Sequence, residues 1–156
     1  MQGMAIISDC GFYRYRLERV WGDGPAATFC MLNPSTADAA LDDPTIRRCI
    51  DFARREDCGR LIVVNLHAWR ATKPAELRLA ADPVGPLNRE HLLAAAEETE
   101  GPLIAAWGGW GPPETGAAAA ELFGPRLQCL GMTQDGRPRH PLYLRKDAEL
   151  RAWPAA

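Results

Sequence analysis

The sequence AATFCMLNPSTADAALDDPTIRRCIDFARREDCGRLIVVNL, residues 26–66, decides the fold. It contains two apolar runs, residues 27–32 and 61–64, on either side of a segment with helical periodicity, residues 42–57. The apolar runs are continuous and do not alternate with polar residues, which is typical of parallel strands covered on both faces. The stretch therefore predicts a strand, a crossover helix and a second strand that pairs in parallel with the first.

The crossover helix has a clear start signal. Asp42 or Asp43 can cap it, and Pro44 suits its first position. Apolar residues spaced three or four apart then form one face that can pack against a sheet. The members of this face are Ile46, Cys49, Ile50 and Ala53.

The alternation of strand and helix continues along the chain. PLIAAWG, residues 102–108, and RLQCLG, residues 126–131, predict two more buried strands. Helices are expected at residues 87–98 and 113–123 and, in RKDAELRAW, at 145–153. Apolar and polar residues alternate in GFYRYRLERVWG, which predicts a half-exposed strand over residues 13–20 at an edge of the sheet. The prediction is a single α/β domain over residues 1–156, a three-layer α/β/α sandwich with a central, mostly parallel sheet.

Composition restricts the class of protein. The chain is 47% apolar and 24% charged and has no apolar run of membrane-spanning length and no signal-peptide pattern. The five cysteines are odd in number and form no C-x-x-C motif, which indicates reduced thiols in the cytoplasm, no disulfide, no metal and no cofactor. They are Cys10, Cys30, Cys49, Cys58 and Cys129.

The charge distribution does not identify a partner. The net charge of −2 provides no general attraction to nucleic acid. All basic residues except Lys73 and Lys146 are arginine, which suits contacts with phosphate and bases. Biased codon composition explains the same abundance of arginine.

Polar or aromatic residues follow each predicted parallel strand. Because parallel strands end at one edge of the sheet, residues far apart in sequence should meet there around one cleft. The candidates are Asn33, Pro34, Ser35 and Thr36 after the first strand, Asn65, Trp69 and Arg70 after the second, Trp107 and Gly108 after the third, and His140 in the loop after the fourth.

Each candidate also has a purely structural interpretation. Asn33 can satisfy its own turn, and Trp107 can be a core residue. His67 competes with His140 as the functional histidine, whereas His91 falls in a predicted helix and reads as a surface residue.

The string LNPSTAD…DDPTIRRC…VVNLHAWRATKP…DPVGPLN…WG resembles the uncharacterised bacterial domain-of-unknown-function family 1643. This resemblance covers roughly residues 13–153 and implies no activity.

The order of motifs also resembles that of the uracil-DNA glycosylase superfamily. Asn33-Pro34 is similar to the Asn-Pro after the first core strand, Asn65 to the Asn at a later strand end, and His140-Pro141 to the His-Pro-Ser loop. RATKPAEL and LIAAWGGWG are similar to further segments of those enzymes. This sequence departs from the pattern at Leu142, where those enzymes carry Ser.

The resemblance implies a uracil-DNA glycosylase-like fold and an N-glycosylase, a hydrolase that acts on a nucleotide or on DNA. In this reading Asn33 positions water, Asn65 reads the base edge, and His140 donates a hydrogen bond to the base. Pro34 fixes the turn, and Ser35 or Thr36 contacts a phosphate.

Further roles remain open. Asp42 or Asp43 can support the reaction, and an aromatic side chain should stack on the base. The aromatic candidates are Phe12, Trp69 and Trp107.

Two other functional classes remain at this point. The first is a non-catalytic module that binds a nucleotide or nucleic acid on the same fold. The second is a cysteine-dependent enzyme that uses Cys30 or Cys49, although Cys30 lies inside a predicted buried strand. The expected assembly is a monomer or a weak homo-oligomer without membrane contact.

Overall fold

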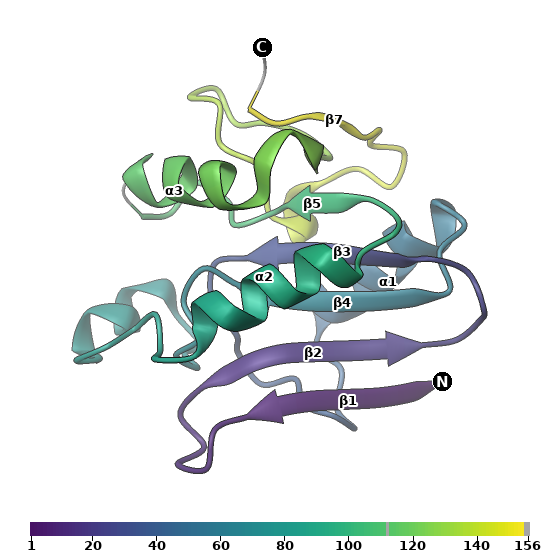
Figure 1. Cartoon of the computed structure of the whole chain (residues 1–156). Helices are drawn as coiled ribbons and strands as arrows, with labels where there is room; N and C mark the ends of the chain where they lie inside the picture. The colour runs from purple at the N-terminus through teal and green to yellow at the C-terminus, as the bar shows by residue number, and fades with distance from the viewer. Residues whose placement is uncertain (112, 155–156) are drawn as a thin grey trace.

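One mixed sheet of seven strands organises the computed structural model, which describes residues 1–111 and 113–154 (Figure 1). The strands are β1 (Gln2–Ile7), β2 (Arg14–Val20), β3 (Ala26–Met31), β4 (Arg60–Asn65), β5 (Leu103–Ala105), β6 (Leu127–Cys129) and β7 (Arg151–Ala152). The α-helices are α1 (Pro44–Arg55), α2 (Asn88–Glu98) and α3 (Pro113–Phe123). Three short 3-10 helices are η1 (Pro74–Leu79), η2 (Gly124–Arg126) and η3 (Pro141–Tyr143).

The strand order is β1-β2-β4-β3-β5-β6-β7. Strands β4, β3, β5 and β6 form a parallel centre, and β2 and β7 pair with its two sides in antiparallel orientation. The register pairs Met31 with Asn65, so β3 and β4 end side by side. The predicted parallel core is confirmed.

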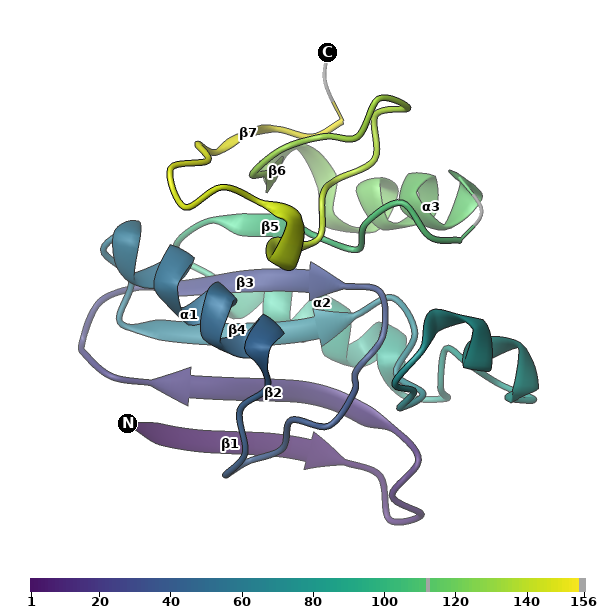
Figure 2. The same ribbon diagram turned by 180° about the vertical axis from the view of Figure 1, so that it is seen from behind.

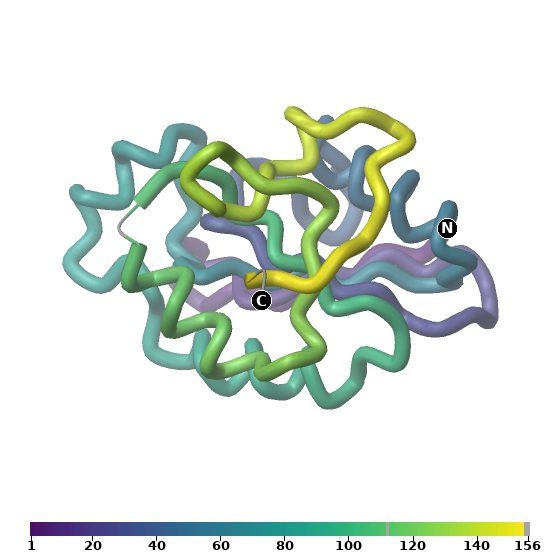
Figure 3. Tube along the Cα trace, turned by 90° about the horizontal axis from the view of Figure 1, so that it is seen from above, coloured from purple at the N-terminus to yellow at the C-terminus, as the bar shows by residue number. Residues whose placement is uncertain are grey.

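Helices cover both faces of this sheet. Helices α2 and α3 lie on one face and α1 on the other, as the two opposite views show (Figures 1 and 2). The view from above shows the same layers, with the strands between α1 and the pair α2 and α3 (Figure 3). The chain runs from β3 through α1 on one face to β4, and from β4 through α2 on the other face to β5, which pairs with the opposite side of β3. It therefore leaves the carboxyl ends of the adjacent strands β3 and β4 towards opposite faces, and such a switch point opens a crevice.

The start of α1 agrees with the sequence prediction. Asp43 is the N-cap, and its carboxylate accepts a hydrogen bond from the Ile46 backbone N–H at 2.9 Å. Pro44 occupies the first turn, where its missing N–H costs nothing. The apolar face, including Cys49 and Ile50, is buried against the sheet.

The continuous apolar runs are explained by two cores. Along β4, Leu61 and Val63 pack on the α1 side, whereas Ile62 and Val64 pack on the α2 and α3 side. All four are fully buried. Burial on both faces removes the alternation that a half-exposed strand would show.

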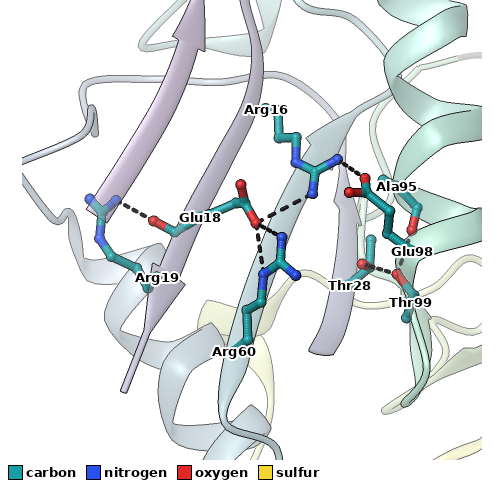
Figure 4. Close-up of polar contacts among 8 residues, drawn as sticks. All are labelled: Arg16, Glu18, Arg19, Thr28, Arg60, Ala95, Glu98 and Thr99. Carbon is teal, nitrogen blue, oxygen red and sulfur yellow. Dashed lines mark hydrogen bonds and ion pairs between the residues drawn. The ribbon is translucent and has the colours of Figure 1, made fainter. Parts of the chain in front are cut away.

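The predicted half-exposed edge strand is wrong. Strand β2 is buried from Arg14 to Arg19. Strand β1 pairs with its outer edge, and residues distant in sequence contact its polar side chains. Arg16 pairs with Glu98 as well as with Glu18 on the same strand, and Glu18 also pairs with Arg60 (Figure 4).

The predicted closing helix is also wrong. The tail forms β7, and the Trp153 backbone N–H donates to the Leu127 oxygen at 3.0 Å. Ala148 and Leu150 pack against the core on the α1 side. The backbone of the tail thus pairs with the open edge of β6 in place of forming a helix.

No helix in the described ranges has the length and apolar character needed to cross a membrane.

Candidate ligand-binding site

A pocket of about 530 Å³ opens at the carboxyl ends of β3, β4 and β5. Its wall also includes the first turn of α1 and the loop before η3. The parallel sheet brings together nine of the residues selected from the sequence. These are Asn33, Pro34, Ser35, Thr36, Asp43, Asn65, Trp107, Gly108 and His140.

Four selected residues, Phe12, Trp69, Arg70 and Asp42, do not line this pocket. Trp69 stacks on the exposed Phe12 with ring centroids 5.1 Å apart. Arg70 donates from Nε to the Ser35 main-chain oxygen at 3.4 Å, and Asp42 pairs with Arg19 at 2.8 Å. These contacts hold loops around the pocket.

Asn65 lines the pocket and has a buried amide without a partner. It forms the last parallel pair of β4, with Met31, and is only 1% exposed. Neither Oδ1 nor Nδ2 has a hydrogen-bond partner among the described residues. A buried amide without partners is costly, so a ligand that offers one donor and one acceptor would be bound strongly here.

The side-chain nitrogen of Asn33 is used in hydrogen bonds within the protein. Nδ2 donates to the Pro34 oxygen at 3.1 Å and to the Ala71 oxygen at 2.8 Å. The backbone N–H of Ala71 donates in turn to the Pro34 oxygen at 2.9 Å. Asn33 therefore joins the loops after β3 and β4, and only its Oδ1 remains for a ligand.

His140 is held as a neutral donor. Its Nδ1 accepts a hydrogen bond from the Leu142 backbone N–H at 3.2 Å, which leaves the proton on Nε2. Burial lowers the pKa of His140 below its ordinary value, although the charge of Asp43 opposes this shift.

Gly108 brings the His140 loop to the pocket. Its backbone N–H donates to the Pro138 oxygen at 2.8 Å, and its φ of +79° lies in the region that favours glycine. A Cβ at this position would lie 3.5 Å from the Cβ of His140. This is an ordinary contact distance, so glycine is favoured here by the positive φ and not by a lack of space.

The aromatic wall has a buried and an exposed part. Trp107 is 5% exposed and packs edge-on against Trp153 at 5.0 Å, so it belongs largely to the core. Trp110, which follows the third predicted strand but was not selected as a site residue, is 45% exposed and lines the pocket. Trp110 also lines an adjoining pocket of about 510 Å³ that contains His67.

Arg14 was also not selected as a site residue. It lines the pocket from the start of β2 and is 2% exposed. Burial lowers its pKa to about 10, although the charge of Asp43 opposes this shift, so the guanidinium stays charged at neutral pH. The only signal in the sequence was an arginine in a strand pattern, which reads equally well as a solvent-facing residue.

Cys30 and Cys49, the two cysteines considered as nucleophiles, are poorly suited to that role. Both are fully buried, and burial raises the pKa of both thiols. Protonated buried thiols are unreactive, which argues against chemistry that depends on either of these two cysteines. Within residues 1–111 and 113–154, no group of three or more His, Cys, Asp or Glu side chains is arranged to hold a metal ion.

His91 is not a plain surface residue, as its stacking on Tyr15 at 5.0 Å shows. It lies outside the pocket and does not compete with His140 for a role there.

Comparison with known proteins identifies a family without an assigned activity. No curated protein and no solved structure matches the chain. Residues 14–142 match the family described as "Protein of unknown function (DUF1643)". The match covers most of the chain, and the protein therefore belongs to this family.

Proposed function

We propose that the pocket binds a nucleobase-containing small molecule, a nucleoside or nucleotide, and that Asn65 reads the edge of the base. The observation that carries this proposal is the buried Asn65 amide with both polar atoms unpartnered. The edge of a nucleobase presents a donor beside an acceptor, which is the complement of a carboxamide. A ligand of this kind satisfies both atoms at once.

The size and the wall of the pocket support a small ligand. A volume of about 530 Å³ is within the range of pockets that enclose small molecules. Trp110 provides an exposed aromatic surface on which a base can stack.

The charge of the pocket favours a free nucleotide over duplex DNA. Among the lining residues only Arg14 and Asp43 are charged at neutral pH, so their charges balance. A polymer of phosphates requires a surface with several basic side chains.

Hydrolysis of the N-glycosidic bond is the second candidate. It rests on the motif order similar to uracil-DNA glycosylases and on Asn33, Asp43 and His140 lining one pocket. In this reaction water adds to C1′, the C–N bond breaks, and the base leaves with its electron pair. Asp43 would take the proton of the water, Asn33 Oδ1 would orient it, and Nε2–H of His140 would stabilise charge on the base oxygen.

Calorimetric titration with the common nucleosides and their 5′-monophosphates tests the binding function. Asn65→Leu should abolish binding, whereas Asn65→Asp should change which base is preferred, because it replaces a donor by an acceptor. Gln134→Leu, which changes an exposed amide outside the pocket, is the control and should bind normally. Equal affinity of wild type and Asn65→Leu would disprove the role of Asn65.

Release of free base from nucleosides, nucleotides and single- or double-stranded oligonucleotides tests the hydrolase. Asp43→Asn keeps an N-cap acceptor but removes the charge, so ligand binding should persist while base release stops. Binding by wild type without base release from any of these compounds would identify a non-catalytic module.

A further inference from the structure

Arg14 differs from the other buried arginines of β2 in having no ion pair. Arg16 pairs with Glu18 and Glu98, and Arg19 pairs with Asp42. Arg14 forms no ion pair with any described residue. Its Nη1 donates to the Ala37 oxygen at 3.0 Å, and its Nε is buried without a hydrogen-bond partner. A charged group at 2% exposure without a counter-charge is a costly arrangement.

The charges around Arg14 do not offset the desolvation cost of its buried guanidinium. Asp43 attracts Arg14, but it is not close enough to form an ion pair, and its Oδ1 is occupied as the cap of α1. Arg19 and Arg70 lie near enough to repel it. The surroundings therefore leave a guanidinium that an anion can still neutralise.

The pocket wall beside Arg14 is suited to an anionic oxygen group. Three residues with side-chain hydroxyls, Ser35, Thr36 and Thr45, line the same pocket. The first turn of α1, a helix of 12 residues, contributes Pro44 and Thr45 to the wall, and the N-terminus of a helix carries partial positive charge. A guanidinium and hydroxyl groups together are typical ligands of phosphate and carboxylate.

We propose that Arg14 binds an anionic group of the pocket ligand, so that the natural ligand is an anionic derivative of a nucleobase and not a neutral nucleoside. The anion is a phosphate on the sugar or a carboxylate on the base. The inference that the ligand contains a base rests on the proposed function of Asn65. The inference that it carries an anionic group rests on Arg14 alone.

The test compares neutral and anionic members of matched pairs by calorimetric titration. Each common nucleoside is compared with its 5′-monophosphate, and uracil with its 6-carboxylate. Wild type should bind the anionic member of at least one pair about tenfold more tightly or better, since a charge-assisted hydrogen bond is at stake. A preference for a 5′-monophosphate would identify the anionic group as a phosphate on the sugar. A preference for the 6-carboxylate of uracil would identify it as a carboxylate on the base.

Three variants separate binding from folding. Arg14→Met should abolish the preference and leave the affinity for the neutral member unchanged, and Arg14→Lys should retain part of it. Arg47→Met removes an exposed arginine outside the pocket and should retain it fully. Without ligand, Arg14→Met should melt at the same or a higher temperature than wild type, whereas a purely structural arginine would give a lower one.

Inorganic phosphate tests whether the pocket binds an anion when no base is attached to it. It should raise the melting temperature of wild type, relative to chloride at equal ionic strength, and have a smaller effect on Arg14→Met. This result would support the anion site even if Asn65→Leu showed that no base is recognised. Equal affinity for neutral and anionic members, or a preference that survives in Arg14→Met, would overturn the proposal and leave the role of Asn65 untouched.

Discussion

Asn88 donates from Nδ2 to the main-chain oxygen of Asn65 at 2.8 Å, which joins the first residue of α2 to the last residue of β4. The same nitrogen also donates to the Leu66 oxygen at 3.2 Å. Asn88 is fully buried, so this contact is shielded from water. The helix on one face of the sheet thereby fixes the strand end whose side chain lies in the pocket wall.

Asn88→Ala should destabilise the protein by about 1–3 kcal/mol, because two buried carbonyl oxygens lose their donor. Urea unfolding measures this change. Gln134→Leu alters an exposed amide and is the control, with an expected change within about 0.5 kcal/mol. An unchanged unfolding free energy in Asn88→Ala would show that other groups hold the end of β4.

Asn65→Leu should have the opposite effect on stability. Its two amide atoms have no partner within the described chain, so an apolar side chain removes a desolvation cost without breaking a hydrogen bond. The free energy of unfolding should stay equal or rise by about 1 kcal/mol. A loss of more than about 1 kcal/mol in the same urea experiment would mean that the amide has a structural partner.

Glu18→Gln should be strongly destabilising. Glu18 is 7% exposed and interacts with both Arg16 and Arg60 (Figure 4). Its loss leaves Arg60 without a carboxylate among the described residues and Arg16 with Glu98 alone. Breaking a buried pair costs about 3–5 kcal/mol.

The matched control for this cluster is Glu56→Gln, which disrupts a partly exposed pair with Arg55. Such a pair contributes about 0–1 kcal/mol. Thermal and urea unfolding of both variants should therefore differ clearly, and similar values would show that the Glu18 cluster is not effectively buried.

Stability should decrease as the pH falls below the ordinary histidine pKa of 6.5. Burial lowers the pKa of His67, His91 and His140, so the unfolded chain binds protons in a range where the folded protein does not. The stabilisation is complete above pH 6.5 and is lost as the pH falls towards the folded pKa values.

Urea unfolding at several pH values between 5 and 8, in wild type and in His140→Gln, measures the share of His140 in this effect. The variant should show a shallower decrease below pH 6.5, since one of the three histidines is gone. An identical pH dependence in both proteins would mean that His140 titrates normally.

The local sequence was sufficient to predict β3, α1 and β4. Asp43 and Pro44 define the start of α1 through capping and backbone geometry alone. The meeting of Asn33, Asn65 and His140 around one pocket also followed from the sequence, because parallel strands end at one edge of a sheet.

The burial of β2 and the path of the C-terminal tail did not follow from the sequence. Charged residues in alternation suggest a solvent-facing strand, and only the approach of Glu98 and Arg60 makes their burial possible. Leu150 lies in a segment with helical periodicity, but the open edge of β6 offers the backbone a better partner.

The sequence by itself determined the strand and helix order and the residues at the strand ends, since these depend on periodicity and capping over short distances. Only the tertiary structure decided which polar groups lack a partner. Asn65 and Asn88 are both buried asparagines, yet Nδ2 of Asn88 is bonded and that of Asn65 has no partner among the described residues. Arg14 and Arg16 lie on one strand, yet only Arg16 meets a carboxylate. The reason is physical: hydrogen bonds and ion pairs depend on positions to within about 1 Å, and packing sets these positions between segments distant in sequence.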